Sequence, residues 1–149
     1  MRAVIQRVTR ASVTIDGIER SRIGTGYLVL LGIHENDTPA QVELLAKKIA
    51  GLRIMRDEND KMNRSLADVD GEILLVSQFT LYGDCSHGNR PSFITAARPE
   101  TAIPLYEYMI KLLGEKTGKE IKTGEFGADM RVDLLNFGPV TILMDTDQM

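Results

Sequence analysis

With 149 residues, 43% of them hydrophobic and 26% charged, the chain has the size and composition of one soluble globular domain, and we expect residues 1–149 to form it. The net charge of −3 argues against a protein that grips nucleic acid by bulk electrostatics, and no apolar run approaches the ~20 residues of a membrane span. One cysteine excludes an internal disulfide, two histidines make a zinc site unexpected, and an N-terminus without a signal peptide's apolar core indicates a cytoplasmic protein.

The first third of the chain is predicted to be largely β-structure. Residues 2–9 and 12–15 alternate in a β pattern, and Asp16-Gly17 is a hairpin signal because glycine tolerates the positive φ of a tight turn. Residues 27–33 follow as a central strand. Arg7 sits among apolar neighbours of the first strand. The simpler interpretation is an arginine that points to solvent, and the alternative is a buried arginine whose five donors hold backbone carbonyls.

Two helices are predicted. Thr38 is a natural N-cap and Pro39 fits the first helical position, so a helix should start there. A second helix is predicted over residues 101–116, with Pro104 in its first turn, where a missing N–H costs nothing. Gly118 should end it.

Polar residues follow directly after a buried strand in the middle of the chain. Residues 73–76 form a short apolar run typical of a strand, and Ser77, Gln78 and Thr80 come next, interleaved with apolar residues. Pattern alone favours a strand whose second half alternates out to solvent. The functional alternative is that these three side chains line a site, where they and unpaired N–H groups at the strand end hold a developing oxyanion.

Residues 83–92 are the least regular part of the chain, and loops carry function more often than strands do. Cys85 and His87 suggest a Cys–His nucleophile, but no third partner is evident that would orient the imidazole. Arg90, which lies in a turn stiffened by Pro91, is the better candidate, as a contact to phosphate.

The last part of the chain contains three predicted strands, at residues 121–126, 130–135 and 140–144. Between the last two lies a turn, Asn136-Phe137-Gly138-Pro139. Because a Gly-Pro bond is cis only about one time in twenty, the pattern alone predicts a trans bond.

Three separated motifs stand out together: the opening MRAVIQRV, the central SQFTLY (77–82) with RPSF (90–93), and the late NFGPVT (136–141). In this order and spacing, which extend along essentially the whole chain, they resemble the D-aminoacyl-tRNA deacylases. One departure is His87, where a lysine or arginine is expected before the glycine. This departure concerns a tRNA contact and not the chemistry.

The resemblance implies an α/β fold with mixed, largely antiparallel β-sheets in a β/β/α layered sandwich with two main helices. It implies a cytosolic homodimer without metal or organic cofactor. The family's substrate is D-aminoacyl-tRNA, whose 3′-terminal ester is hydrolysed to free D-amino acid and tRNA, with rejection of L-aminoacyl groups. Glycyl-tRNA, including glycine mischarged on tRNA(Ala), is a further expected substrate because glycine has no side chain to exclude.

The resemblance also assigns residues. The family's SQFT motif falls on Ser77 to Thr80 and its Gly-cis-Pro motif on Gly138-Pro139, which enters the partner subunit's active site. Backbone N–H groups near Phe79 and Thr80 would stabilise an oxyanion. Carbonyls around Gly138-Pro139 would receive the ammonium group, and Arg7 would hold that loop. The expected roles are catalysis for Gln78, Phe79 and Thr80, substrate binding for Ser77, Gly138, Pro139 and Arg7, and tRNA binding for Arg90 and His87.

Two other interpretations remain open. A non-catalytic RNA-binding module would use the polar cluster only to position phosphates, although the acidic charge and few aromatic residues fit this poorly. A conventional esterase would use Ser77 or Thr80 as nucleophile, but the chain has no G-x-S-x-G motif, and neither histidine has a clear orienting carboxylate.

Overall fold

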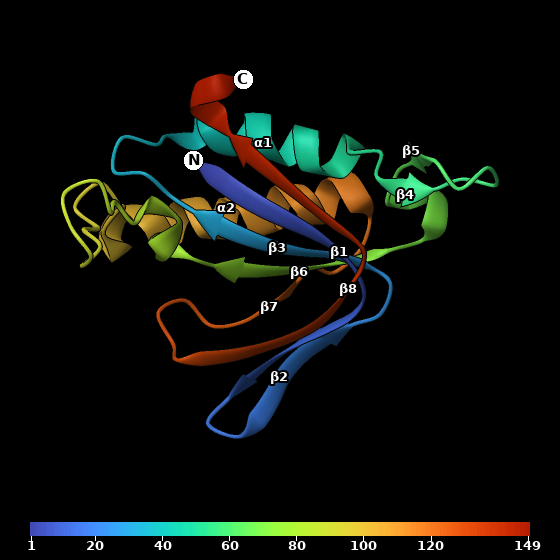
Figure 1. The fold of residues 1–149 in the computed structure, drawn as a ribbon, viewed down its shortest axis with the longest axis horizontal. Helices are drawn as coiled ribbons and strands as arrows, with labels where there is room; N and C mark the ends of the chain where they lie inside the picture. Colours follow the sequence, from blue (N-terminus) through green and yellow to red (C-terminus); the bar gives the residue numbers. More distant parts are fainter.

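The computed structural model describes all 149 residues and contains two helices and eight strands (Figure 1). The helices are α1 (Pro39–Gly51) and α2 (Pro99–Thr117). The strands are β1 (Arg2–Ile15), β2 (Ile18–Ile23), β3 (Gly26–Gly32), β4 (Met55–Arg56), β5 (Met62–Arg64), β6 (Glu72–Ser77), β7 (Lys122–Thr123) and β8 (Met130–Asp145). Neither helix is both long and apolar enough to cross a membrane.

One mixed sheet organises the molecule. Its strand order is β2-β1-β3-β6-β7, and β8 also pairs with β1, while β4 and β5 form a separate two-stranded ribbon. The pairs made by β1 are antiparallel, and β6 runs parallel to both β3 and β7. The strand predicted over residues 121–126 is only two residues long, because β7 pairs with β6 only at Leu74 and Leu75.

Strands β3 and β6 are buried on both faces. On one face, Tyr27 and Leu75 belong to a core of 22 buried residues shared with the helices. On the other, Leu28 and Leu74 join a smaller core with the second half of β1 and with β2. Figure 1 shows both helices on one side of the sheet, with β2 and the beginning of β8 on the other. This arrangement confirms the predicted β/β/α layering with two main helices.

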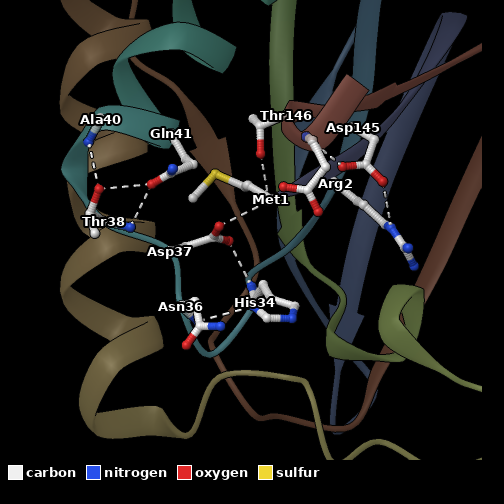
Figure 2. Close-up of polar contacts among 11 residues, drawn as sticks. Met1, Arg2, His34, Asn36, Asp37, Thr38, Ala40, Gln41, Asp145 and Thr146 are labelled. Carbon is white, nitrogen blue, oxygen red and sulfur yellow. Dashed lines mark hydrogen bonds and ion pairs between the residues drawn. The ribbon is translucent and has the colours of Figure 1, made fainter. Parts of the chain in front are cut away.

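Several helix and strand ends lie where local sequence signals predict them. Asp16 and Gly17 both adopt positive φ in the β1–β2 hairpin, at 52° and 77°. Thr38 caps α1: its side chain accepts from the Ala40 N–H, and the Gln41 side chain accepts from the Thr38 N–H at 2.7 Å (Figure 2). These two hydrogen bonds satisfy N–H groups that have no partner within the helix.

The start of α2 differs from the prediction. The helix begins at Pro99, two residues earlier, so Pro99 takes the first position and Pro104 lies inside the helix rather than in its first turn. Pro104 is on the exposed side of α2. A carbonyl that loses its N–H partner to a proline there can bond to water.

A single long strand, β8, replaces the two predicted strands and the turn between them. Gln6 pairs with Thr141 and Val8 with Asn136, so residues 137–140 lie opposite Arg7 alone. We call Phe137–Pro139 the bulge. The Gly138-Pro139 bond is cis, so the trans geometry that pattern alone predicts is wrong, and the cis geometry implied by the resemblance is confirmed.

The two ends of the chain meet beside α1. The Met1 ammonium group donates to Asp37 Oδ1 at 3.0 Å and to Thr146 Oγ1 at 2.8 Å (Figure 2). Because Met1 is buried, this pair fixes the start of β1 and the end of β8 against the loop before α1.

Candidate active site

The candidate site begins where β6 ends. The Gln78 N–H makes the last bond of this strand to β3, donating to the Leu31 carbonyl at 2.7 Å. After it the chain forms a short 3₁₀ helix, Phe79–Tyr82, which we call the turn. The prediction of a strand that continues toward solvent beyond Ser77 is therefore wrong.

The turn exposes two adjacent backbone donors. Its own hydrogen bonds start with the Leu81 N–H, which donates to the Gln78 carbonyl at 3.2 Å. The N–H groups of Phe79 and Thr80 donate to no protein acceptor, as expected for the first positions of a helical turn. Both residues are exposed, and the Gln78 side-chain amide donates to the Thr80 hydroxyl. These two N–H groups are thus available to a ligand.

An apolar cleft of about 230 Å³ opens beside the turn. Ser77 and Gln78 contribute its polar edge and Phe79 lies beside them, its ring packed edge-on against Phe93 at a centroid distance of 5.2 Å. The wall comes from β3 and β6, the start of α2, and the beginning of β8 with the segment that leads into it. Its residues include Leu31, Ile33, Val76, Ala97, Ala102, Phe126, Met130 and Val132.

Arg7 forms the centre of a second cluster. The side chain is only 2% exposed, so the buried-arginine interpretation is confirmed and the solvent-facing one is wrong. Its Nε donates to the Phe137 carbonyl at 3.1 Å and its Nη1 to the Ile54 carbonyl at 2.8 Å. The guanidinium carbon also lies 4.2 Å from the Phe137 ring centroid. Burial, and then the nearby Arg56, lower the pKa of Arg7.

The bulge has room for glycine alone at its centre. Gly138 has a φ of +126°, and a Cβ there would lie 2.8 Å from Val140 Cγ2 and 2.9 Å from Arg7 Nη2. The Val140 N–H donates to the Asn136 side chain at 2.9 Å, which closes the bulge from its other side. Gly138 and Pro139 are exposed. The bulge is therefore fixed by Arg7 and Asn136, and its backbone at Gly138 and Pro139 faces outward.

The two clusters lie far apart within one chain. Ser77 aligns with Leu31, Ala3 and Met144 across β6, β3, β1 and β8. Pro139 is thus separated from Ser77 by three strand spacings of ~4.8 Å and five residues of ~3.3 Å, or roughly 20 Å. In Figure 1, the loop after the turn and the β4–β5 ribbon, next to which Arg7 binds Ile54, lie at opposite ends of the long axis.

The remaining predicted residues lie in the loop that follows the turn. Arg90 and His87 are exposed and make no ion pair or hydrogen bond within the chain. Cys85 is exposed too, and no hydrogen bond joins it to His87. No group of three or more His, Cys, Asp or Glu side chains lies close enough together to hold a metal ion.

Sequence reasoning missed two features of the site. The apolar wall is one, because its residues, from Leu31 to Val132, come from segments far apart in the sequence and form no motif. Arg2 is the other: its Nη1 donates to the Leu81 carbonyl at 2.9 Å, at the end of the turn. The sequence places Arg2 at the start of a predicted strand and in the opening MRAVIQRV motif, but neither feature indicates which group it binds.

Comparisons with known proteins agree over nearly the whole chain. A family model described as D-Tyr-tRNA(Tyr) deacylase matches residues 4–145. The chain is similar to D-aminoacyl-tRNA deacylases of Phocaeicola vulgatus and Bacteroides fragilis, at 56% and 57% identity over 146 residues, which cover 98% of this chain and 97% of each relative.

Solved structures show the same likeness. The c-Myc DNA Unwinding Element Binding Protein matches with a TM-score of 0.91 at 44% identity, over 98% of this chain and 99% of that chain. A structure described as a probable eukaryotic D-amino acid tRNA deacylase matches with a TM-score of 0.83 at 15% identity, over 96% of this chain and 97% of that one. The second match is a likeness of fold.

Proposed function

The chain belongs to the D-Tyr-tRNA(Tyr) deacylase family, and on this premise we propose that it hydrolyses the ester bond of D-aminoacyl-tRNA, releasing free D-amino acid and tRNA. The observation that carries the chemistry is the pair of unengaged N–H groups of Phe79 and Thr80 at the edge of the cleft. An aminoacyl ester is already activated. Two fixed donors that stabilise the oxyanion, with a correctly positioned substrate, are therefore the main requirement.

The attacking group needs no side-chain nucleophile in this mechanism. Neither Ser77 nor Thr80 is hydrogen-bonded to a histidine or a carboxylate that would activate its hydroxyl. We propose that the vicinal 2′-hydroxyl of the terminal ribose assists the hydrolysis. Ser77 and Gln78 then bind and orient the ester at the edge of the cleft.

The bulge supplies the chiral selection. Its backbone carbonyls around Gly138 and Pro139 receive the substrate's ammonium group, and the close backbone leaves no room for the side chain of an L-amino acid. A D side chain points away from the bulge, so many D-amino acids are accepted. Selection by clash distinguishes enantiomers without contacts to the side chain. Glycyl-tRNA, including glycine mischarged on tRNA(Ala), is accepted as well, because glycine has no side chain that could clash with the bulge.

The bulge acts in the cleft of a second copy of the chain. Within one chain roughly 20 Å separate it from the cleft, so a homodimer is the arrangement that brings the two together. β8 pairs only with β1, and its other edge therefore carries unpaired backbone groups. Leu135 and Leu143 on the same strand are 43% and 78% exposed, which gives a partner apolar surface to cover.

The tRNA itself is contacted beside the cleft. Arg90 and His87 have no partners within the chain and lie in the loop after the turn, so they are free to meet the phosphates of the 3′ end. Because charged tRNA is the substrate, we place the reaction in the cytoplasm.

The direct test compares D-tyrosyl-tRNA, L-tyrosyl-tRNA and glycyl-tRNA with the purified protein, following loss of the ester. We expect cleavage of the D- and glycyl-substrates and survival of the L-substrate. Equal cleavage of both enantiomers would contradict selection by the bulge. Binding without cleavage would support an RNA-binding module, and an acyl adduct trapped on Ser77 or Thr80 would support a conventional esterase.

A further inference from the structure

Arg2 joins three parts of the molecule at the back of the turn. Its Nη1 donates to the Leu81 carbonyl at 2.9 Å, and its Nε donates to Asp145 Oδ2 at 3.0 Å (Figure 2 shows the contact with Asp145). The guanidinium carbon lies 4.5 Å from the centroid of the Tyr82 ring. One planar cation therefore contacts the turn twice while the end of β8 fixes it from the other side.

The Leu81 carbonyl depends on this contact. Carbonyls at the end of a helical turn have no partner within it, and no backbone N–H donates to Leu81 O. Arg2 is the donor that this group has within the chain. The other end of the turn is fixed independently, by the bond from the Gln78 N–H to the Leu31 carbonyl.

The turn also lies against a glycine of β3. A Cβ at Gly32 would be 3.0 Å from Leu81 Cβ and 3.1 Å from the Gln78 carbonyl oxygen, so the turn rests on the bare backbone of the strand. Arg2 pairs with Gly32 in the β1–β3 ladder. Strand, glycine and arginine thus form a single support beneath the two exposed donors.

We propose that Arg2 is a positioning residue for the hydrolysis: by holding the Leu81 carbonyl and the Tyr82 ring, it sets the direction of the Phe79 and Thr80 N–H groups. Arg2 does not line the cleft. This role rests on the proposed function, in which those N–H groups stabilise the oxyanion. A small rotation of the turn moves both donors together, and loss of alignment slows the chemical step more than it weakens binding.

The test compares Arg2→Met with Arg10→Met in the full-length protein. Arg10 lies on the same strand and forms the same kind of exposed ion pair, with Asp133 on β8, but has no contact with the turn. For Arg2→Met we expect kcat on D-tyrosyl-tRNA to fall about 10- to 100-fold, while KM changes less than about threefold. For Arg10→Met we expect kcat within about twofold of the wild type.

A second measurement separates positioning from simple loss of stability. In ¹H–¹⁵N spectra, the Phe79 and Thr80 amide resonances should shift or broaden in Arg2→Met and stay unchanged in Arg10→Met. Asp145→Asn, which leaves the contacts of Arg2 with Leu81 and Tyr82 in place, should lower kcat less than about threefold. If Arg2→Met does not fold, Arg2→Lys keeps the stem and the charge but lacks the two-pronged geometry, and a partial loss of kcat with the same resonance shifts is expected.

The outcomes distinguish the two proposals. Inactivity of the wild-type protein on every aminoacyl-tRNA would contradict the proposed function, whatever Arg2 does. An active wild type with a folded Arg2 variant that keeps full kcat, or unmoved Phe79 and Thr80 resonances, would overturn the positioning role alone.

Discussion

The turn after β6 and the bulge in β8 both present backbone, and each is held by an arginine of β1, but in opposite environments. Arg7 is buried and donates to two backbone carbonyls. Arg2 is 44% exposed on its side chain and shares its donors between a carbonyl and a carboxylate. The bulge is therefore anchored in the core through Arg7, although Gly138 and Pro139 are themselves exposed, whereas the turn is held by an arginine at the surface.

The largest effect should come from the turn's own donors. Phe79→Pro removes one N–H at the first position of the turn, where a helical turn tolerates proline because this N–H has no partner within it. Relative to Phe79→Ala, which loses the ring but keeps the donor, we expect a rate lower by about 10²–10³-fold. Single-turnover hydrolysis of D-tyrosyl-tRNA measures it. Equal rates for the two variants would show that the Phe79 N–H does not stabilise an oxyanion.

The buried arginine should matter for both stability and activity. Arg7→Met leaves the carbonyls of Phe137 and Ile54 without their donor, so we expect the free energy of unfolding to fall by about 2–3 kcal/mol. Urea denaturation measures the loss. Arg64→Met is the matched control, since exposed Arg64 forms an ion pair with exposed Glu58 and does not contact the bulge. An Arg7→Met protein as stable as the control would show that the bulge is held by packing alone.

A smaller effect is expected at Thr80. Thr80→Ala removes the hydroxyl that accepts from Gln78 but keeps the backbone N–H. Because the donor remains, the rate should fall less than about tenfold, well under the loss of a whole oxyanion donor. The same single-turnover assay applies. A loss as large as that of Phe79→Pro would assign the hydroxyl a direct part in the reaction.

The smallest expected effect is a dependence of stability on pH, which the ion pair of Arg2 with Asp145 should show and the contacts of Arg7 should not. Burial acts to raise the pKa of Asp145, but hydrogen bonds from the Asp147 N–H and Arg2 outweigh it and lower the pKa below its ordinary value. The contribution of Asp145 to stability is thus present above about pH 4, the value of the unfolded chain, and is lost as the pH falls through the lower folded value.

Denaturation curves of the wild type and Asp145→Asn should therefore differ by at most about 1 kcal/mol at pH 7 and converge as the pH falls below about 4. Arg7 binds two carbonyls, which do not titrate, so the difference between the wild type and Arg7→Met should stay constant over the same range. A constant difference for Asp145→Asn as well would show that its carboxylate makes no contribution to folding.

The features that could be predicted from the sequence are those whose causes are local. Thr38-Pro39 and Asp16-Gly17 work through neighbouring residues, and the structure places both as expected. The end of β6 was not predictable, because it depends on a carbonyl of Leu31, 47 residues away in the chain. The partner of Arg7, 130 residues away, depends in turn on a bulge that exists only once β8 pairs with β1.

The same distinction applies to the candidate site. Motif resemblance assigned Ser77 to Thr80, and the structure places three of these four residues on one cleft, with Thr80 next in the chain. It assigned Gly138-Pro139 and Arg7, and the structure brings those together elsewhere. Arg2 lies in the opening MRAVIQRV motif, but the motif does not reveal its role, which depends on contacts with Leu81 and Asp145 that form only in the folded chain.

The central claim is that the turn of one subunit and the bulge of another form a single active site, and mixed dimers test it most directly. Gly138→Ala places a Cβ against Val140 and Arg7 and should inactivate the bulge, while Phe79→Pro inactivates the turn. In a dimer of one subunit of each kind, one site combines the intact turn with the intact bulge, and the other carries both lesions. We predict that co-expressed mixed dimers recover about half of the wild-type activity although neither homodimer is active. No recovery in verified mixed dimers, or full activity of a monomer, would contradict the account.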